Sequence, residues 1–219
     1  MDAVPPRLGL RRSSTSSSTP QQSPSIPPVS AHTRTLSSYV DVDKLRKHND
    51  SKEIELIWRA GHTKESQICA VIPNEIYSRM VALARKHPMF ILPLPRETGI
   101  EMHFMQFKFP ERNVSHLLFT SLLEYKIHGE FARPHTTIMH FEDLKDEKGI
   151  VLMRGEVDVQ QKAIGLDEAS ALVMSVQRLY GADERSEGGR NRRTLIEAFT
   201  KGSEEFNVDK LMDELSRID

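Results

Sequence analysis

Apolar residues recur at helical spacing in several segments of the chain. In the segment that begins at Ser51 and ends at Gly61, Ile54, Ile57 and Trp58 fall on one face of a helix whose first turn is acidic. Similar patterns, bounded by capping residues, glycine or proline, predict helices over residues 42–48, 51–61, 74–87, 166–180, 193–199 and 208–218.

The centre of the chain follows a different pattern. Residues 100–109 alternate with a period of two, and both alternating sets carry large apolar side chains, which predicts a strand covered on both faces. Apolar runs predict further strands over residues 68–72, 89–92, 117–120, 135–141 and 150–157. Helices, then a strand-rich centre, then helices are typical of an α+β fold, here a single domain over residues 40–219 with a mainly antiparallel sheet.

The first 38 residues have a different composition. They hold six of the 12 prolines, are rich in serine, and contain one acidic residue against four arginines. A segment with so few apolar groups cannot offset the entropy of ordering, so it is predicted to be disordered. This arginine-rich, serine-rich and acid-poor composition is also typical of an organellar transit segment, and an ordinary flexible tail is the alternative.

The whole chain has 219 residues, of which 38% are hydrophobic and 28% charged, and its formal net charge is −1. This length suits one domain, and the balanced charge argues against a nucleic-acid-binding protein, which would carry surplus lysine and arginine. The longest apolar run, residues 88–95, is far shorter than the ~20 residues that cross a bilayer. Because Cys69 is the only cysteine, we exclude an intramolecular disulfide. Together with the short apolar run, this predicts a soluble protein of a reducing compartment.

Sequence motifs for catalysis or cofactor binding are absent. The chain has no glycine-rich nucleotide loop, no H-E-x-x-H and no G-x-S-x-G motif, and no strand precedes the glycine pair at 188–189. Candidate ligands gather in one region: Glu124, His128, Glu130, His135 and His140. Their spacing fits no compact metal site, so we expect no metal and no cofactor. The alternative function is a small metal-dependent or acid–base hydrolase that uses Glu124, His128 and His135.

Residues 89–96, Met-Phe-Ile-Leu-Pro-Leu-Pro-Arg, combine an apolar run with two prolines. Pro93 and Pro95 cannot donate hydrogen bonds to a neighbouring strand, so the run cannot be an ordinary central strand. Three arrangements are compatible with it: an edge strand, an extended segment within the core, or an exposed hydrophobic ridge that serves as a docking surface.

Residues 87–96 resemble the signature of the mitochondrial ATP synthase F(1) complex assembly factor family, the chaperones that bind the free beta subunit of the F(1) head. The likeness continues through residues 119–126, 128–130, 134–135 and 148–157. The resemblance implies a monomeric, ATP-independent and non-enzymatic chaperone of the mitochondrial matrix, which holds new beta subunits until alpha subunits displace it. It carries over no active site.

The resemblance also gives the apolar run an expected use. A chaperone that covers an apolar subunit interface needs an apolar surface of its own, and proline would stiffen such a ridge and block its self-association. We therefore expect residues of the run and of the segment 125–128 to border the beta-subunit site: Phe90, Leu92, Leu94, Arg96, Tyr125 and His128. Burial of the run in the core is the alternative.

Overall fold

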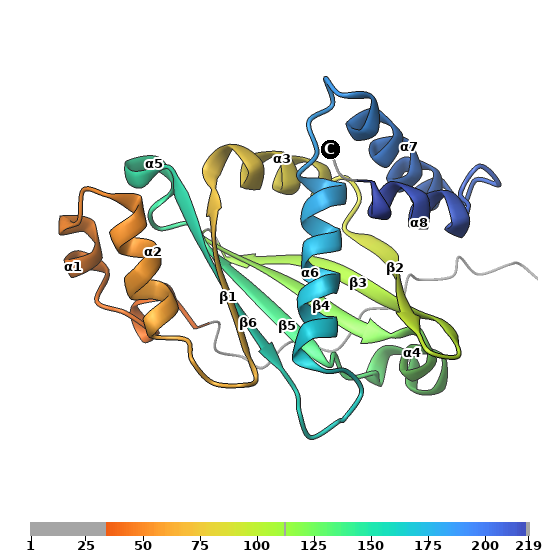
Figure 1. Cartoon of the computed structure of the whole chain (residues 1–219), viewed down its shortest axis with the longest axis horizontal. Coiled ribbons are helices and arrows are strands. Elements are labelled where there is room, and N and C mark those ends of the chain that lie inside the picture. Colours follow the sequence, from red (N-terminus) through yellow and green to blue (C-terminus); the bar gives the residue numbers. More distant parts are fainter. Residues whose placement is uncertain (1–33, 112, 218–219) are drawn as a thin grey trace, which may run out of the picture.

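A six-stranded antiparallel sheet organises the chain. The computed structural model describes residues 34–111 and 113–217, and its strands lie in the order β1-β6-β5-β4-β3-β2 (Figure 1). The strand bounds are β1 (Gln67–Pro73), β2 (Met89–Arg96), β3 (Gly99–Glu111), β4 (Val114–Ser121), β5 (Thr136–Phe141) and β6 (Ile150–Val157). Each strand from β2 to β5 pairs with the next strand in sequence, and β1 pairs with β6. The predicted α+β fold with an antiparallel sheet is confirmed.

Four helices belong to the main core on one face of the sheet: α3 (Asn74–Ala84), α6 (Leu166–Tyr180), α7 (Glu187–Lys201) and α8 (Val208–Ser216). The connection through α3 joins the two edge strands, and α6 crosses the middle of the sheet (Figure 1). Alternate strand residues such as Met105, Leu117 and Val151 share this core with Leu172 and Val176 of α6. No helix within the described ranges is long and apolar enough to cross a membrane.

A smaller core lies on the opposite face of β1, β5 and β6. Its helical cover comes from η1 (Leu36–Ser38), α1 (Val42–Lys47) and α2 (Ser51–Ala60). Trp58 of α2 is fully buried there, and its indole Nε1 donates a hydrogen bond to the carbonyl oxygen of Met153 at 3.0 Å. Leu36 is fully buried as well. The folded domain therefore begins before the predicted boundary at residue 38, because Leu36 completes this core. The rest of the predicted disordered segment, residues 1–33, lies outside the described residues.

Most predicted elements are confirmed, with shifts at their ends. The bounds of β6 and α6 agree with the predictions, whereas α3 ends at Ala84, three residues before the predicted end. Short helices are the elements that the pattern misses: η1, α4 (Leu122–His128), η2 (Gly129–Phe131) and α5 (Lys145–Lys148). Each has few turns over which a period could be recognised.

The helix predicted over residues 193–199 is the later part of α7, which begins at Glu187 and therefore includes the glycine pair at 188–189. Ser186 caps this helix, and its Oγ accepts a hydrogen bond from the backbone N–H of Gly189 at 2.9 Å. A Cβ atom at Gly189 would lie 1.9 Å from the carbonyl oxygen of Asp183. Glycine is therefore required here because the helix start packs directly against the preceding backbone.

Strand β2 is an edge strand, one of the three arrangements compatible with its prolines. The carbonyl oxygen of Pro88 accepts a hydrogen bond from Phe107 of β3 at 2.7 Å. In an antiparallel pair the N–H and C=O of one residue point the same way. The backbone groups of the even-numbered residues therefore point toward β3, whereas the backbone groups of Pro93 and Pro95 point toward the open edge. The prolines thus cost the sheet no hydrogen bond and block the edge against further strands.

Candidate functional site

The apolar side chains of β2 do not form an exposed ridge. Phe90 and Leu92 are fully buried and Leu94 is 5% exposed, so the expectation of an exposed docking surface is wrong for these three residues. Phe90 makes edge contacts with the rings of Tyr180 in α6 and Phe199 in α7, with centroids 6.5 and 5.0 Å apart. The run is core because α6 and α7 cover the face on which its even-numbered residues lie.

Arg96 holds the end of β2 in place. Its guanidinium pairs with Glu101 of β3 at 2.7 Å and with Glu168 in the first turn of α6, and it donates a hydrogen bond to the carbonyl oxygen of Ala163 at 3.2 Å. The hydrogen bonds to Glu101 raise the pKa of Arg96 above its ordinary value. With these partners the guanidinium links β2, β3 and α6.

The helix that follows β4 carries the most exposed apolar side chains of this region. Leu123 and Ile127 of α4 are 66% and 65% exposed, and Phe131 of η2 is 72% exposed. We call these three residues the α4 surface. On another side of α4, Tyr125 stacks on Phe104 of β3 with centroids 5.2 Å apart, which fastens the helix to the sheet.

Two of the predicted site residues therefore lie beside the α4 surface. Tyr125 is half-buried against β3, and His128 is exposed at the end of α4. The His128 Nδ1 lies 3.0 Å from a carboxylate oxygen of Glu124, one turn earlier. Arg96 lies at the same end of the sheet, where β2 and β4 end and β3 and β5 begin.

The same end of the sheet has a small pocket of about 230 Å³, lined by Ser121, Glu124, Arg133, His135, Gln161 and Ala163. It brings two candidate residues of the hydrolase alternative together, Glu124 and His135. Both ring nitrogens of His135 are occupied, however: His103 lies 3.0 Å from Nε2 and Thr136 lies 2.9 Å from Nδ1. Within residues 34–111 and 113–217, no three histidine, cysteine or acidic side chains are arranged to hold a metal ion.

Two histidines are buried in the neutral form. Burial, together with nearby His103 and Arg96, lowers the pKa of His135 to about 3. Burial also lowers the pKa of His140 to about 3. The Nδ1 of His140 lies 3.2 Å from the hydroxyl of Ser115, but both side chains are at most 1% exposed, so no substrate can reach this pair.

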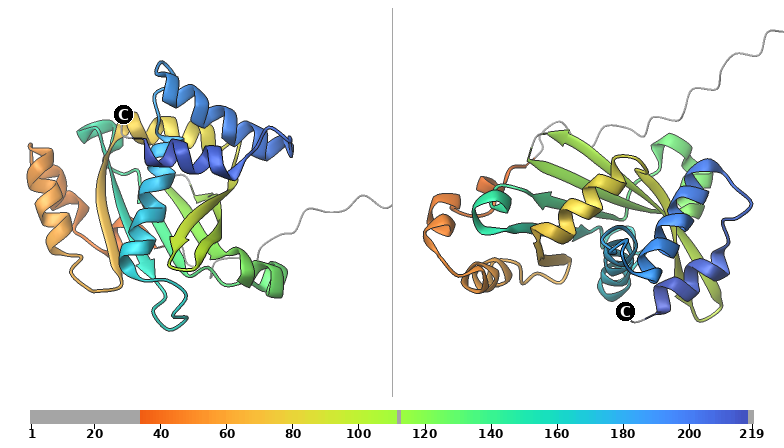
Figure 2. Two further views of the ribbon diagram at one scale, coloured as in Figure 1. Left: turned by 45° about the vertical axis from the view of Figure 1, so that its right-hand side comes forward. Right: turned by 90° about the horizontal axis from the view of Figure 1, so that it is seen from above.

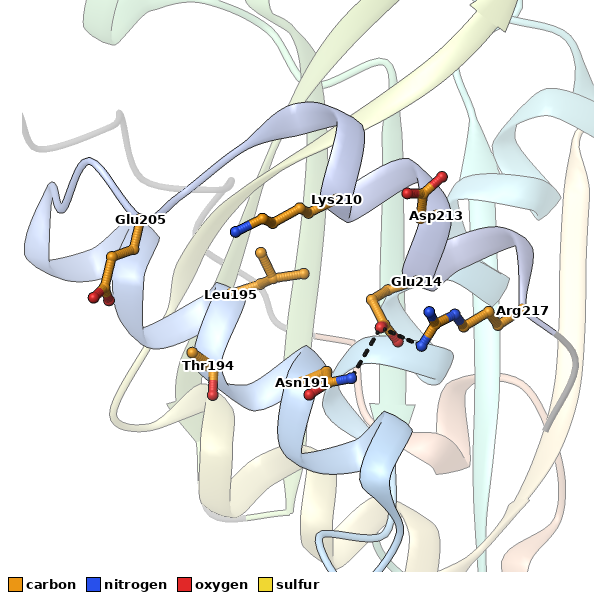
Figure 3. A pocket seen from close by; sticks show the side chains of 8 residues that line it. All are labelled: Asn191, Thr194, Leu195, Glu205, Lys210, Asp213, Glu214 and Arg217. Atoms are coloured by element: carbon orange, nitrogen blue, oxygen red, sulfur yellow. Dashed lines mark hydrogen bonds and ion pairs between the residues drawn. The ribbon is translucent and has the colours of Figure 1, made fainter.

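A larger pocket of about 440 Å³ lies between α7 and α8, and Figure 3 shows eight side chains that line it. The buried Glu214 carboxylate accepts hydrogen bonds from Asn191 at 3.2 Å and Arg217 at 2.9 Å. Arg192 lies 3.8 Å from the other carboxylate oxygen. The charge of the Glu214 carboxylate in this pocket is thus balanced by two arginines of the same chain.

Sequence reasoning did not single out the side chains of the α4 surface: Leu123 and Phe131 lie outside the predicted segment 125–128, and Ile127 lies within it without being named. A usable signal was present, because Ser121 and Glu124 have the S-x-x-E spacing of a helix start. In the structure the Ser121 Oγ accepts a hydrogen bond from the backbone N–H of Glu124 at 3.1 Å. A helix beginning at residue 122 places Leu123 and Ile127 one turn apart on a common face.

Comparison with known proteins identifies the family. The sequence profile described as ATP11 protein matches residues 6–212. "Protein atp11, mitochondrial" of Schizosaccharomyces pombe is 42% identical over 185 residues, which cover 84% of this chain and 63% of that protein. Human "ATP synthase mitochondrial F1 complex assembly factor 1" is 31% identical over 184 residues, covering 84% of this chain and 52% of that protein. The chain therefore matches between about half and two thirds of these relatives' lengths, and it belongs to the ATP11 protein family.

Proposed function

We propose that this chain is an ATP-independent assembly chaperone of the mitochondrial F1 complex, which binds the unassembled beta subunit and gives it up to the alpha subunit. The observation that carries the proposal is family membership over nearly the whole chain, together with relatives named F1 complex assembly factors. The proposed place of action is the mitochondrial matrix, with the arginine-rich and serine-rich segment that precedes Leu36 as the delivery segment.

The exposed α4 surface supports this role physically. A beta subunit without its neighbours exposes apolar interface, and such surface aggregates at cellular concentrations. A chaperone can cover that interface only with apolar groups of its own, held on a rigid domain. Release then needs no nucleotide, because the final partner competes for the same interface.

The hydrolase alternative has weaker support. Glu124 and His135 line a common pocket, but a general base must have a ring nitrogen within reach of the substrate, and both nitrogens of His135 bond within the fold. His128 is paired with Glu124 on the surface rather than with His135. We therefore propose a role without catalysis.

Size-exclusion chromatography of the purified full chain with separate F1 subunits tests the proposal. We expect a one-to-one complex with the beta subunit in nucleotide-free buffer, unchanged by added ATP, and no complex with assembled F1. The alpha subunit serves as the matched control, since it has a similar need for assembly partners. No complex with beta, or equal retention of assembled F1, would contradict the proposed function.

A further inference from the structure

The α4 surface concentrates exposed apolar groups more than other parts of the described chain. Leu123, Ile127 and Phe131 are each more than 60% exposed and lie within residues 123–131. Other comparably exposed apolar residues lie on separate elements, such as Leu56 on α2 and Met174 on α6. A clustered patch of this kind on a monomer is more often functional than a single exposed side chain.

The local structure holds this patch as a narrow ridge. Leu123 and Ile127 are one helical turn apart, and Tyr125 anchors the helix on Phe104. Gly129 ends α4 with φ +57° and ψ −126°, a conformation that favours glycine. The chain then turns into η2, which packs against α4 and presents Phe131. Figure 2 shows α4 standing out from the end of the sheet.

The size of the ridge restricts what can cover it. The three side chains together expose on the order of 400 Å², the size of a functional patch on a monomer. A stable dimer buries about 800 Å² on each partner, so a second copy of this chain would not be held by the ridge alone. A patch of this size suits a contact of moderate affinity, which a chaperone must be able to release.

The shape of the ridge indicates the partner's surface. A helix that offers apolar residues one turn apart is recognised by an apolar groove, the arrangement in which amphipathic helices bind folded domains. We infer that the α4 surface docks as a short ridge into an apolar groove of the unassembled beta subunit, a groove that is closed in the assembled head. The identity of the partner rests on the proposed function, whereas the docking residues follow from the ridge.

A paired substitution tests the inference in the full chain. Leu123→Asp with Ile127→Gln removes both helical anchors but keeps the helix, because aspartate suits its first turn and glutamine is a good helix former. We expect the Kd for the beta subunit to rise at least 10-fold in titrations, with the melting temperature unchanged. The matched control, Leu56→Gln with Met174→Gln, removes two exposed apolar side chains on other elements, 68% and 56% exposed, and should bind as wild type.

The outcomes separate the docking site from the function. If the wild-type chain binds beta and the α4 variant binds equally well, the inference is overturned and the proposed function stands. If the wild-type chain does not bind beta, both are overturned. A wild-type dimer that the α4 variant abolishes would also overturn the inference, because the occupant would be a second copy. Should the double variant unfold, Phe131→Ala, which lies outside α4, is expected to weaken binding about fivefold, and unchanged binding would overturn the inference.

Discussion

Leu94→Asp is expected to destabilise the folded domain by about 3–5 kcal/mol, because it places an unpaired carboxylate in the main core. Leu94 is 5% exposed and shares that core with residues of α6 and α7. Urea unfolding, followed by the fluorescence of Trp58, measures the effect; this residue is the only tryptophan and is fully buried.

Met89→Asp is the matched control for Leu94→Asp on the same strand. Met89 is 44% exposed, and we expect its replacement to cost less than about 1 kcal/mol. A Leu94→Asp protein that unfolds like wild type but loses beta-subunit binding would contradict the buried position of β2. That result would favour the exposed docking ridge, one of the three arrangements that the sequence of residues 89–96 allows.

Acid is expected to weaken the fold by about 3 kcal/mol between pH 7.5 and pH 5.5. His135 and His140 have folded-state pKa values of about 3, against ordinary values of 6.5. Below pH 6.5 the unfolded chain therefore binds protons that the folded chain does not, which lowers the free energy of unfolding by roughly 1–2 kcal/mol per histidine at pH 5.5. The contribution of these two histidines to the free energy of unfolding is present above pH 6.5 and is lost progressively as the pH falls toward 3.

Urea unfolding at pH 7.5, 6.5 and 5.5 measures this dependence. His140→Gln should flatten the pH profile by about half, at the expense of some stability at pH 7.5, since the two histidines contribute equally. A free energy of unfolding that does not change between pH 7.5 and 5.5 would contradict the neutral, buried state of both residues.

Long elements with one clear period could be predicted from the sequence. The helix α6 follows a single apolar face through Leu172, Val176 and Leu179 up to Gly181, and all three leucine and valine side chains are buried. Strand β6 begins directly after Gly149, whose left-handed conformation ends the preceding turn. In these elements local pattern and tertiary environment agree.

Elements whose form depends on distant contacts could not be predicted. The prolines of β2 fit an edge strand and an exposed ridge equally well, because only the later helices α6 and α7 decide which side of Phe90 is covered. The start of α7 has two glycines and several charges, a poor local pattern for a helix. Burial of Leu195 and Ile196 further along stabilises it nonetheless.

In the candidate site, too, some features could be predicted from the local sequence and others depend on the folded structure. The family resemblance indicates the segment 125–128, which holds Tyr125 and His128, but it does not show that the exposed side chains of Leu123 and Ile127 form the surface there. Apolar residues in a short helix next to a strand look like more strand, since Leu122 and Leu123 simply extend the apolar run of β4. Exposure, which distinguishes them, is a property of the folded chain alone.

Displacement by the alpha subunit tests the proposed chaperone role most directly. The full chain, carrying a fluorescent label, is bound to immobilised beta subunit, and purified alpha subunit is then added in nucleotide-free buffer. We expect the labelled chain to leave the surface in proportion to the alpha subunit that binds, with no requirement for ATP. Retention of the chain on the assembled alpha–beta complex, or release that depends on ATP hydrolysis, would contradict the proposed function.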